Sequence, residues 1–214
     1  MLMERGGLVM WPLLLLSVLS VMLIVERIWF YVRQNSPGSL GRVRQMARLL
    51  RSGDRDGAAN LASVDRSVYG RFVKHLLEEG GSEAAAGEAA ETQQRRLERF
   101  MPTLSTIITA APMLGILGTV LGIITSFEIL SEGTQTTDPR DVSGGIAEAL
   151  ITTAVGLVIA LIVLFPYNAF RAQMERTMSR LETLASAVQM TEPSDATAAS
   201  KPTETNTRNA TNTK

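Results

Sequence analysis

Residues 100–127 read FMPTLSTIITAAPMLGILGTVLGIITSF and contain no charged side chain. Two further stretches share this property: residues 6–25, GGLVMWPLLLLSVLSVMLIV, and residues 149–170, ALITTAVGLVIALIVLFPYNAF. Each has the roughly 20 residues that a helix rising about 1.5 Å per residue needs to cross about 30 Å of hydrocarbon. The apolar residues are continuous rather than alternating, which indicates helices, because a backbone in lipid must satisfy its own hydrogen bonds. The stretches therefore predict an all-α integral membrane protein with three transmembrane helices.

The bulk composition conceals this pattern. The chain has 214 residues, a net charge of zero and 45% hydrophobic residues, which are values of an ordinary soluble domain. It has no cysteine, which excludes disulfides, cysteine-ligated zinc and a thiol nucleophile. The single His75 lies in a polar stretch, and we interpret it as a solvated surface residue. Because the spans contain no His, Cys, Asp or Lys, we predict that the chain is not an enzyme and that it binds no cofactor.

The first apolar stretch is read as a retained anchor rather than a cleaved signal peptide. It is longer than a usual signal-peptide core, and no small-x-small cleavage site follows it. It ends instead in the run ERIWFY at residues 26–31, whose aromatic residues and charge pair suit a membrane–water boundary.

Arginines indicate the orientation of the spans. They follow the first span, precede the second and follow the third, whereas the loop between the second and third has one Arg140 against Glu132, Asp138 and Asp141. Positive charge near spans marks the cytoplasmic side. The expected segments are an outer N-terminus with the first transmembrane helix (1–31), a cytoplasmic helical segment (32–100), the second transmembrane helix (101–130), an outer loop (131–141), the third transmembrane helix (142–170), a cytoplasmic helical extension (171–190) and a disordered tail (191–214).

Helical spacing of apolar residues predicts the elements of the cytoplasmic segment. One helix contains Leu40, Val43 and Leu50, a second contains Leu61, and a third covers residues 69–79. Ser82 is a candidate N-cap for a fourth helix, which meets no breaker between residues 88 and 101 and is expected to enter the membrane directly, with Pro102 and Pro112 as candidate kinks. The arginines of the first helix are interpreted as a solvated face and an orientation signal, rather than as a specific site for anionic lipid or nucleic acid.

Small and hydroxyl residues distinguish the second and third spans from simple anchors. The glycines let helix backbones approach closely in lipid, and we assign them to helix packing: Gly115, Gly118, Gly122 and Gly156. Ser105, Thr119 and Ser126 recur at intervals of seven residues or twice that, so they form one narrow stripe. A polar stripe on an apolar helix is expected to face protein or water.

Glu148 is the acidic residue placed within the third span. Inserting an ionised carboxylate near mid-membrane costs about 3 kcal/mol, so Glu148 should be protonated, partnered or exposed to a wet cavity. Each of these makes it a candidate proton site. The alternative is a glutamate at a helix end that reaches the outer headgroups. Thr152 shares the helix face of Glu148, whereas Thr153 points about 140° away from it at about 100° per residue.

Two strings in these spans, AAPMLGILGTVLGIITSF (110–127) and GIAEALITTAVGLVIA (145–160), resemble the paired signatures of the MotA/TolQ/ExbB proton-channel family. The three-span layout is similar to TolQ and ExbB rather than to four-span flagellar MotA. The resemblance covers about residues 8–185. It implies that the family's functional threonines and acidic residue correspond to Thr119, Thr153 and Glu148, with Thr152 as a further pathway candidate from its position on the helix.

The resemblance also implies how the protein works. The expected assembly is a homo-pentamer in the bacterial inner membrane, with the N-terminus periplasmic and the C-terminus cytoplasmic. Its lumen would hold an ExbD/TolR-like single-span partner, and a TonB- or TolA-like protein would receive the work. Protons are the transported ion, and nucleic acid is not a partner. The resemblance spans TonB-dependent uptake, Tol-type envelope maintenance and other motors alike.

The competing hypothesis is a non-conducting membrane scaffold that binds partners through its cytoplasmic helices. It accounts for the glycines but leaves Glu148 without a role.

Overall fold

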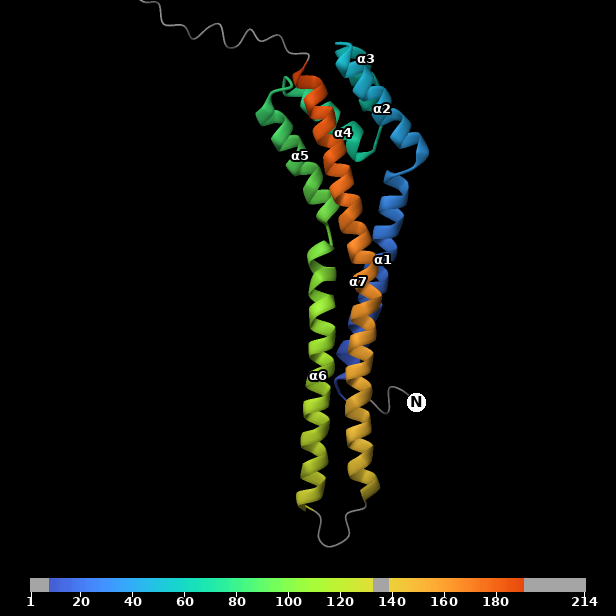
Figure 1. Cartoon of the computed structure of the whole chain (residues 1–214), viewed down its shortest axis with the longest axis vertical. Coiled ribbons are helices and arrows are strands. Elements are labelled where there is room, and N and C mark those ends of the chain that lie inside the picture. The colour runs from blue at the N-terminus through green and yellow to red at the C-terminus, as the bar shows by residue number, and fades with distance from the viewer. Residues whose placement is uncertain (1–7, 133–138, 191–214) are drawn as a thin grey trace, which may run out of the picture.

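Seven helices make up the computed structural model, which describes residues 8–132 and 139–190. The expected outer loop falls largely outside the described residues, as do the first residues of the N-terminus and the tail from residue 191. The described part of the chain contains no strand. The helices, labelled in Figure 1, are α1 Met10–Gln34, α2 Pro37–Arg51, α3 Arg55–Val64, α4 Val68–Glu78, α5 Glu83–Glu98, α6 Met101–Glu132 and α7 Pro139–Gln189.

The three long helices α1, α6 and α7 form one elongated bundle (Figure 1). The helices α6 and α7 run antiparallel along most of the length, and α1 packs beside both of them. At 51 residues, α7 continues past the apolar stretch without interruption, as the spacing of its apolar residues predicts. Consequently one continuous helix connects the apolar part of the molecule to its polar end.

The polar end consists of α2, α3, α4 and α5 (Figure 1): α2, α4 and α5 pack against the C-terminal half of α7, and α3 packs against α2 and α4. Side-chain caps define where these helices begin: Ser36, Asp54, Ser67 and Ser82 each accept a hydrogen bond from a backbone N–H three residues on. The helices lie where the sequence places them, and Ser82 is the predicted cap. Their core is fully buried and aromatic at Tyr69 and Phe72. His75 is half-buried with its Nε2 shielded, so the expectation of a solvated side chain is wrong.

Three helical segments are long and apolar enough to cross a membrane: Met10–Gln34, Glu83–Ser131 and Val142–Gln189. Their outward faces carry large apolar side chains, such as Met22 on α1 and Phe165 on α7, which are 69% and 73% exposed. Water would penalise such continuous apolar surfaces, whereas lipid accommodates them. The all-helical architecture with three candidate spans agrees with the sequence prediction.

The helix that begins at Ser82 does not enter the membrane directly, contrary to the prediction. The helix α5 ends at Glu98, and Phe100 has a positive φ of 69° before α6 begins at Met101. The reason is Pro102, whose ring would clash with the carbonyl oxygen four residues earlier, that of Glu98, in a continuous helix. The second candidate span therefore consists of two helices joined at a sharp break.

Arg27 stabilises the end of α5 at this break. From the sequence, Arg27 was expected to be a residue of the membrane–water boundary, paired with Glu26 at the surface. Its side chain is 1% exposed and lies between two rings, 4.9 Å from the centroid of Phe30 and 5.2 Å from that of Phe100. Its Nη1 donates to the carbonyl oxygens of Arg96 at 3.4 Å and Leu97 at 3.3 Å, and its Nε donates to Glu26 at 2.7 Å. Since the last carbonyls of a helix lack helical partners, the guanidinium caps α5 from another helix.

Candidate functional site

The contact between α6 and α7 depends on small residues. A Cβ on Gly115 would come within 2.9 Å of the Cα of Thr153, and a Cβ on Gly122 would come within 2.7 Å of the Cβ of Ala149. Two more close approaches involve Gly118 against the side chain of Thr152 and Gly156 against the carbonyl of Ala111. The structure thus places all four glycines assigned to packing against the facing helix, where any larger residue would force the helices apart.

Thr119 and Thr153 meet across this contact, hydroxyl to hydroxyl. Both hydroxyls also lie close to the carbonyl oxygen of Gly115, Thr119 at 3.1 Å and Thr153 at 2.9 Å. A hydroxyl has one proton to donate, so one threonine donates to the carbonyl and the other to its partner or to the same carbonyl. Both hydroxyl protons are therefore already donated, either to Gly115 O or to the partner hydroxyl. A water beside the two threonines can only donate a hydrogen bond to their hydroxyl oxygens.

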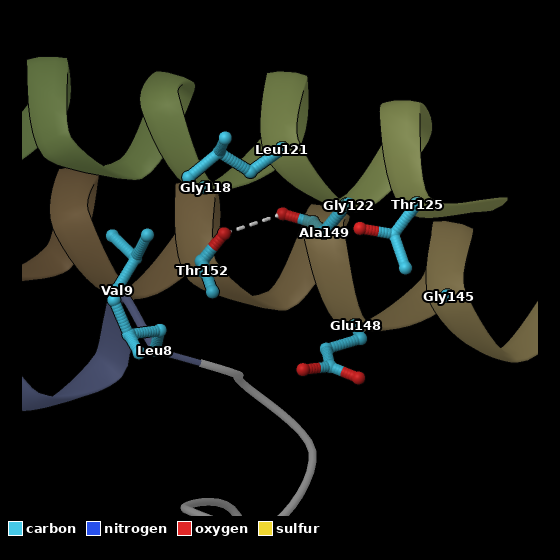
Figure 2. Close-up of a pocket in the computed structure, with 10 residues that line it drawn as sticks. All are labelled: Leu8, Val9, Gly118, Leu121, Gly122, Thr125, Gly145, Glu148, Ala149 and Thr152. Carbon is cyan, nitrogen blue, oxygen red and sulfur yellow. Dashed lines mark hydrogen bonds between the residues drawn. The ribbon is translucent and has the colours of Figure 1, made fainter. Parts of the chain in front are cut away.

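Glu148 lies at a different place on the same helix pair, beside a cavity of about 310 Å³. Figure 2 shows residues of α6, of α7 and of the turn before α1 around it, and the carboxylate points away from α6 and from Thr152. The lining comprises Leu8, Val9, Gly118, Leu121, Gly122, Thr125, Gly145, Glu148, Ala149 and Thr152. Within residues 8–132 and 139–190, the half-buried carboxylate of Glu148 has no hydrogen bond or ion pair.

Thr152 lines the same cavity as Glu148, as their shared helix face suggests. Its hydroxyl is nevertheless turned toward α6, because it lies 3.4 Å from Gly115 O of that helix while also donating to Ala149 O of its own helix at 2.7 Å, and the residue is 2% exposed. Thr119 and Thr153 do not line the cavity. The predicted pathway residues therefore fall into two groups, the hydroxyl pair between the helices and the carboxylate beside the cavity.

The hydroxyl stripe of α6 also faces protein at Ser126. This residue is 2% exposed and donates to Gly122 O at 2.8 Å and to Val142 O of α7 at 3.4 Å. Thr125 was not singled out, although its spacing of seven from Gly118 places it on the cavity face. Leu8 and Val9 come from the turn before α1, and no local pattern links them to Glu148.

Metal binding has no support from the described part of the chain. No group of three or more His, Cys, Asp or Glu side chains in the described ranges is arranged to hold a metal ion.

Close-packed helices, three of them long and apolar enough to cross a membrane, define the class of multi-pass membrane proteins. Comparison with known protein families identifies the family to which the chain belongs. The chain belongs to the MotA/TolQ/ExbB proton channel family, whose model matches residues 61–183. It is an ExbB/TolQ-like biopolymer transport protein and not an enzyme.

Individual relatives cover most of the chain. It is 36% identical to the putative biopolymer transport protein ExbB-like 3 of Synechocystis, over 83% of this chain and 87% of that protein. It is 29% identical to the biopolymer transport protein exbB1 of Vibrio cholerae, over 84% of this chain and 82% of the relative. The Tol-Pal system protein TolQ of Pseudomonas aeruginosa is 40% identical over 45% of this chain and 42% of its own. The resemblance seen in the two signature strings is thereby confirmed.

Proposed function

We propose that this protein is the proton-conducting subunit of a membrane motor, and that Glu148 is its titrating group. The observation that carries the proposal is the carboxylate of Glu148, half-buried at a cavity between apolar helices and without a partner among the described residues. A carboxylate in such a place is stable only if it is neutral, hydrated or paired with a group from another chain. All three conditions suit a site that gains and loses a proton.

The energies involved are of matching size. Holding a charged carboxylate near mid-membrane costs about 3 kcal/mol, and one proton crossing 100 mV releases about 2.3 kcal/mol. A site with such a cost can alternate between its charged and neutral forms under a physiological potential. The cavity beside Glu148, at about 310 Å³, has room for the water that this exchange needs.

A single chain supplies only part of the proposed pathway. Among the described residues that line the cavity, Glu148 is the only carboxylate, so these residues offer no second one to pass a proton to. This fits a homo-pentamer whose α6 and α7 helices surround an ExbD/TolR-like single-span partner that carries the next acidic group. A TonB- or TolA-like protein would then transmit the work to the outer membrane. In the proposed topology the N-terminus is periplasmic, the segment 32–100 and the extension 171–190 are cytoplasmic, and the chain lies in the bacterial inner membrane.

The replacement of Glu148 by glutamine tests the proposal. Glutamine keeps the size and the hydrogen-bonding capacity but does not titrate, so proton-dependent activity should fall at least tenfold while assembly with the partner is retained. The measurements are complementation of a strain that lacks the gene and co-purification of the partner. Full activity of Glu148→Gln at normal expression would refute the proton role. Loss of assembly as well as activity would make Glu148 structural and would favour the non-conducting scaffold.

The hydroxyl pair is examined in the same assay. Thr119→Val and Thr153→Val each keep the shape and remove one hydroxyl, so the surviving hydroxyl can still donate to Gly115 O. We expect partial activity from each variant and a larger loss from the double variant.

A further inference from the structure

A second cavity, of about 600 Å³, lies where α1 leaves the apolar part of the bundle and meets the polar end. Its walls come from the last turns of α1, the start of α2 and the connection between α3 and α4. It is separate from the cavity of Glu148 and shares no lining residue with it. Its volume falls within the range of about 300–1,000 Å³ typical of small-molecule sites.

Three shielded hydrogen-bond donors at this cavity have no acceptor in the described structure. They are Gln34 Nε2, Ser39 Oγ and Arg42 Nε. Gln34 is 5% exposed and Ser39 is 1% exposed, so solvent does not readily satisfy them. The Oε1 atom of Gln34 already accepts from Val68 N at 3.3 Å, which leaves its Nε2 as the free end. Buried donors without acceptors are costly, and a ligand that offers acceptors would remove the cost.

The charged residues at the cavity also favour an anionic ligand. The two lining carboxylates are already paired, Glu26 with Arg27 at 2.7 Å and Asp65 with Arg42 at 3.1 Å. Three further lining cations, Arg33, Arg66 and Arg71, have no acidic partner among the described residues. An anion that accepts hydrogen bonds would satisfy both the free donors and the unpaired arginines.

The pKa of Arg71 reflects the positive charges that lie close together at this cavity. Burial and the guanidinium of Arg96 lower the pKa of Arg71 below its ordinary value, and Asp65 only partly opposes them. A bound anion would offset the repulsion between the two arginines.

The position of the cavity along α1 indicates how the anion arrives. Trp29 lines the cavity and is 67% exposed, and Val32 beside it is 66% exposed. A tryptophan followed by arginines at the end of an apolar span is typical of the headgroup level of a membrane. The apolar outer face of α1 therefore runs up to the cavity, and an acyl chain can lie along it while the headgroup enters.

We propose that this cavity binds the phosphodiester of an anionic phospholipid, with Arg33 and Arg71 facing the phosphate and the donors of Gln34, Ser39 and Arg42 completing the site. Because the site joins α1 to α2 and α4, a bound lipid would tie the first span to the polar end. The proposal depends on the membrane location of the chain and not on the proton role of Glu148.

The test uses the purified full-length protein in an uncharged detergent. Its melting temperature is followed while dioleoylphosphatidylglycerol, dioleoylphosphatidylcholine or inorganic phosphate is added at constant ionic strength. The phosphatidylglycerol should raise the melting temperature and saturate. In the Arg33→Gln/Arg71→Gln variant the midpoint concentration should rise at least about tenfold, as expected for the loss of two charge-assisted contacts. The matched control, Arg95→Gln/Arg176→Gln, removes two exposed arginines outside the cavity and should stay within about twofold of the wild type.

Ser39→Ala provides a second variant with little risk to folding. It removes one shielded donor and should raise the midpoint by about threefold. An equal shift in the cavity and control double variants would overturn the proposal. Equal stabilisation by phosphatidylcholine would show that the anion is not recognised, and equal stabilisation by inorganic phosphate would overturn the assignment to a lipid.

Discussion

Replacing Arg27 with methionine should destabilise the junction between α5 and α6. Methionine fills a similar volume with an unbranched apolar chain, so the change removes the charge and the donors without opening a large cavity. The carbonyl oxygen of Arg96 then loses its side-chain donor, and that of Leu97 retains only Tyr31 Oη, at 3.2 Å. The stacking of the guanidinium on Phe30 and Phe100 is lost as well.

The structure sets the size of the effect. Two hydrogen bonds from a charged donor contribute about 1.5–3 kcal/mol each when short, and those of Arg27 to the carbonyls are long, so the lower end applies. Cation–π contacts of a desolvated arginine add about 1–2 kcal/mol. The desolvation cost of a buried charge, which methionine does not incur, offsets part of this sum. A net loss of about 2–4 kcal/mol corresponds to a decrease of about 5–15 °C in melting temperature for a chain of this size.

Circular dichroism of the detergent-solubilised protein measures the melting temperature, with Arg95→Met as the control. Arg95 lies on α5 one residue before Arg96, is exposed and bonds only to Glu91, so its replacement should leave the melting temperature nearly unchanged. Adding Tyr31→Phe to Arg27→Met should cost more than the two single changes together, because Leu97 O then loses both side-chain donors. A decrease of less than about 2 °C for Arg27→Met would refute the capping role.

Two further predictions concern backbone strain and topology. Gly80→Ala should destabilise the protein by about 1 kcal/mol because Gly80 has a φ of 81°, whereas Gly87→Ala, in the interior of α5 with open space around it, should stabilise it by up to about 1 kcal/mol. In a denaturation assay, stabilisation by Gly80→Ala together with destabilisation by Gly87→Ala would contradict the assigned conformations. The native chain has no cysteine, so a cysteine replacing Thr136 should react with an impermeant reagent in intact cells and one replacing Ser67 should not, and the reverse pattern would overturn the orientation.

Much of the fold follows from local patterns. The three spans, the helices of the polar end and the Ser82 cap were predictable because each depends on residues within one or two turns of one another. Pro102 was a candidate kink in the sequence, but the complete break at Phe100 was not predicted, because a left-handed phenylalanine has no sequence signature.

The candidate site was less predictable than the spans. Helical spacing relates Glu148 to Thr152 on one helix, but it does not say that the hydroxyl of Thr152 also reaches Gly115 O of α6. Family resemblance singled out Thr119 and Thr153, but it did not predict that their hydroxyls meet, because this depends on how two helices are rotated and shifted against each other.

By itself, the sequence determined that this chain has three segments long and apolar enough to cross a membrane and that Glu148 stands among apolar residues, because transfer into lipid is a sum over consecutive residues. Only the tertiary structure decided the role of Arg27. In the sequence Arg27 is typical of a membrane boundary, but in the structure it caps the end of a helix about 70 positions later in the chain. It also gathered Gln34, Ser39 and Arg71 from three helices around one cavity. Contacts between residues so far apart in the chain depend on the packing of whole helices, which no local pattern specifies.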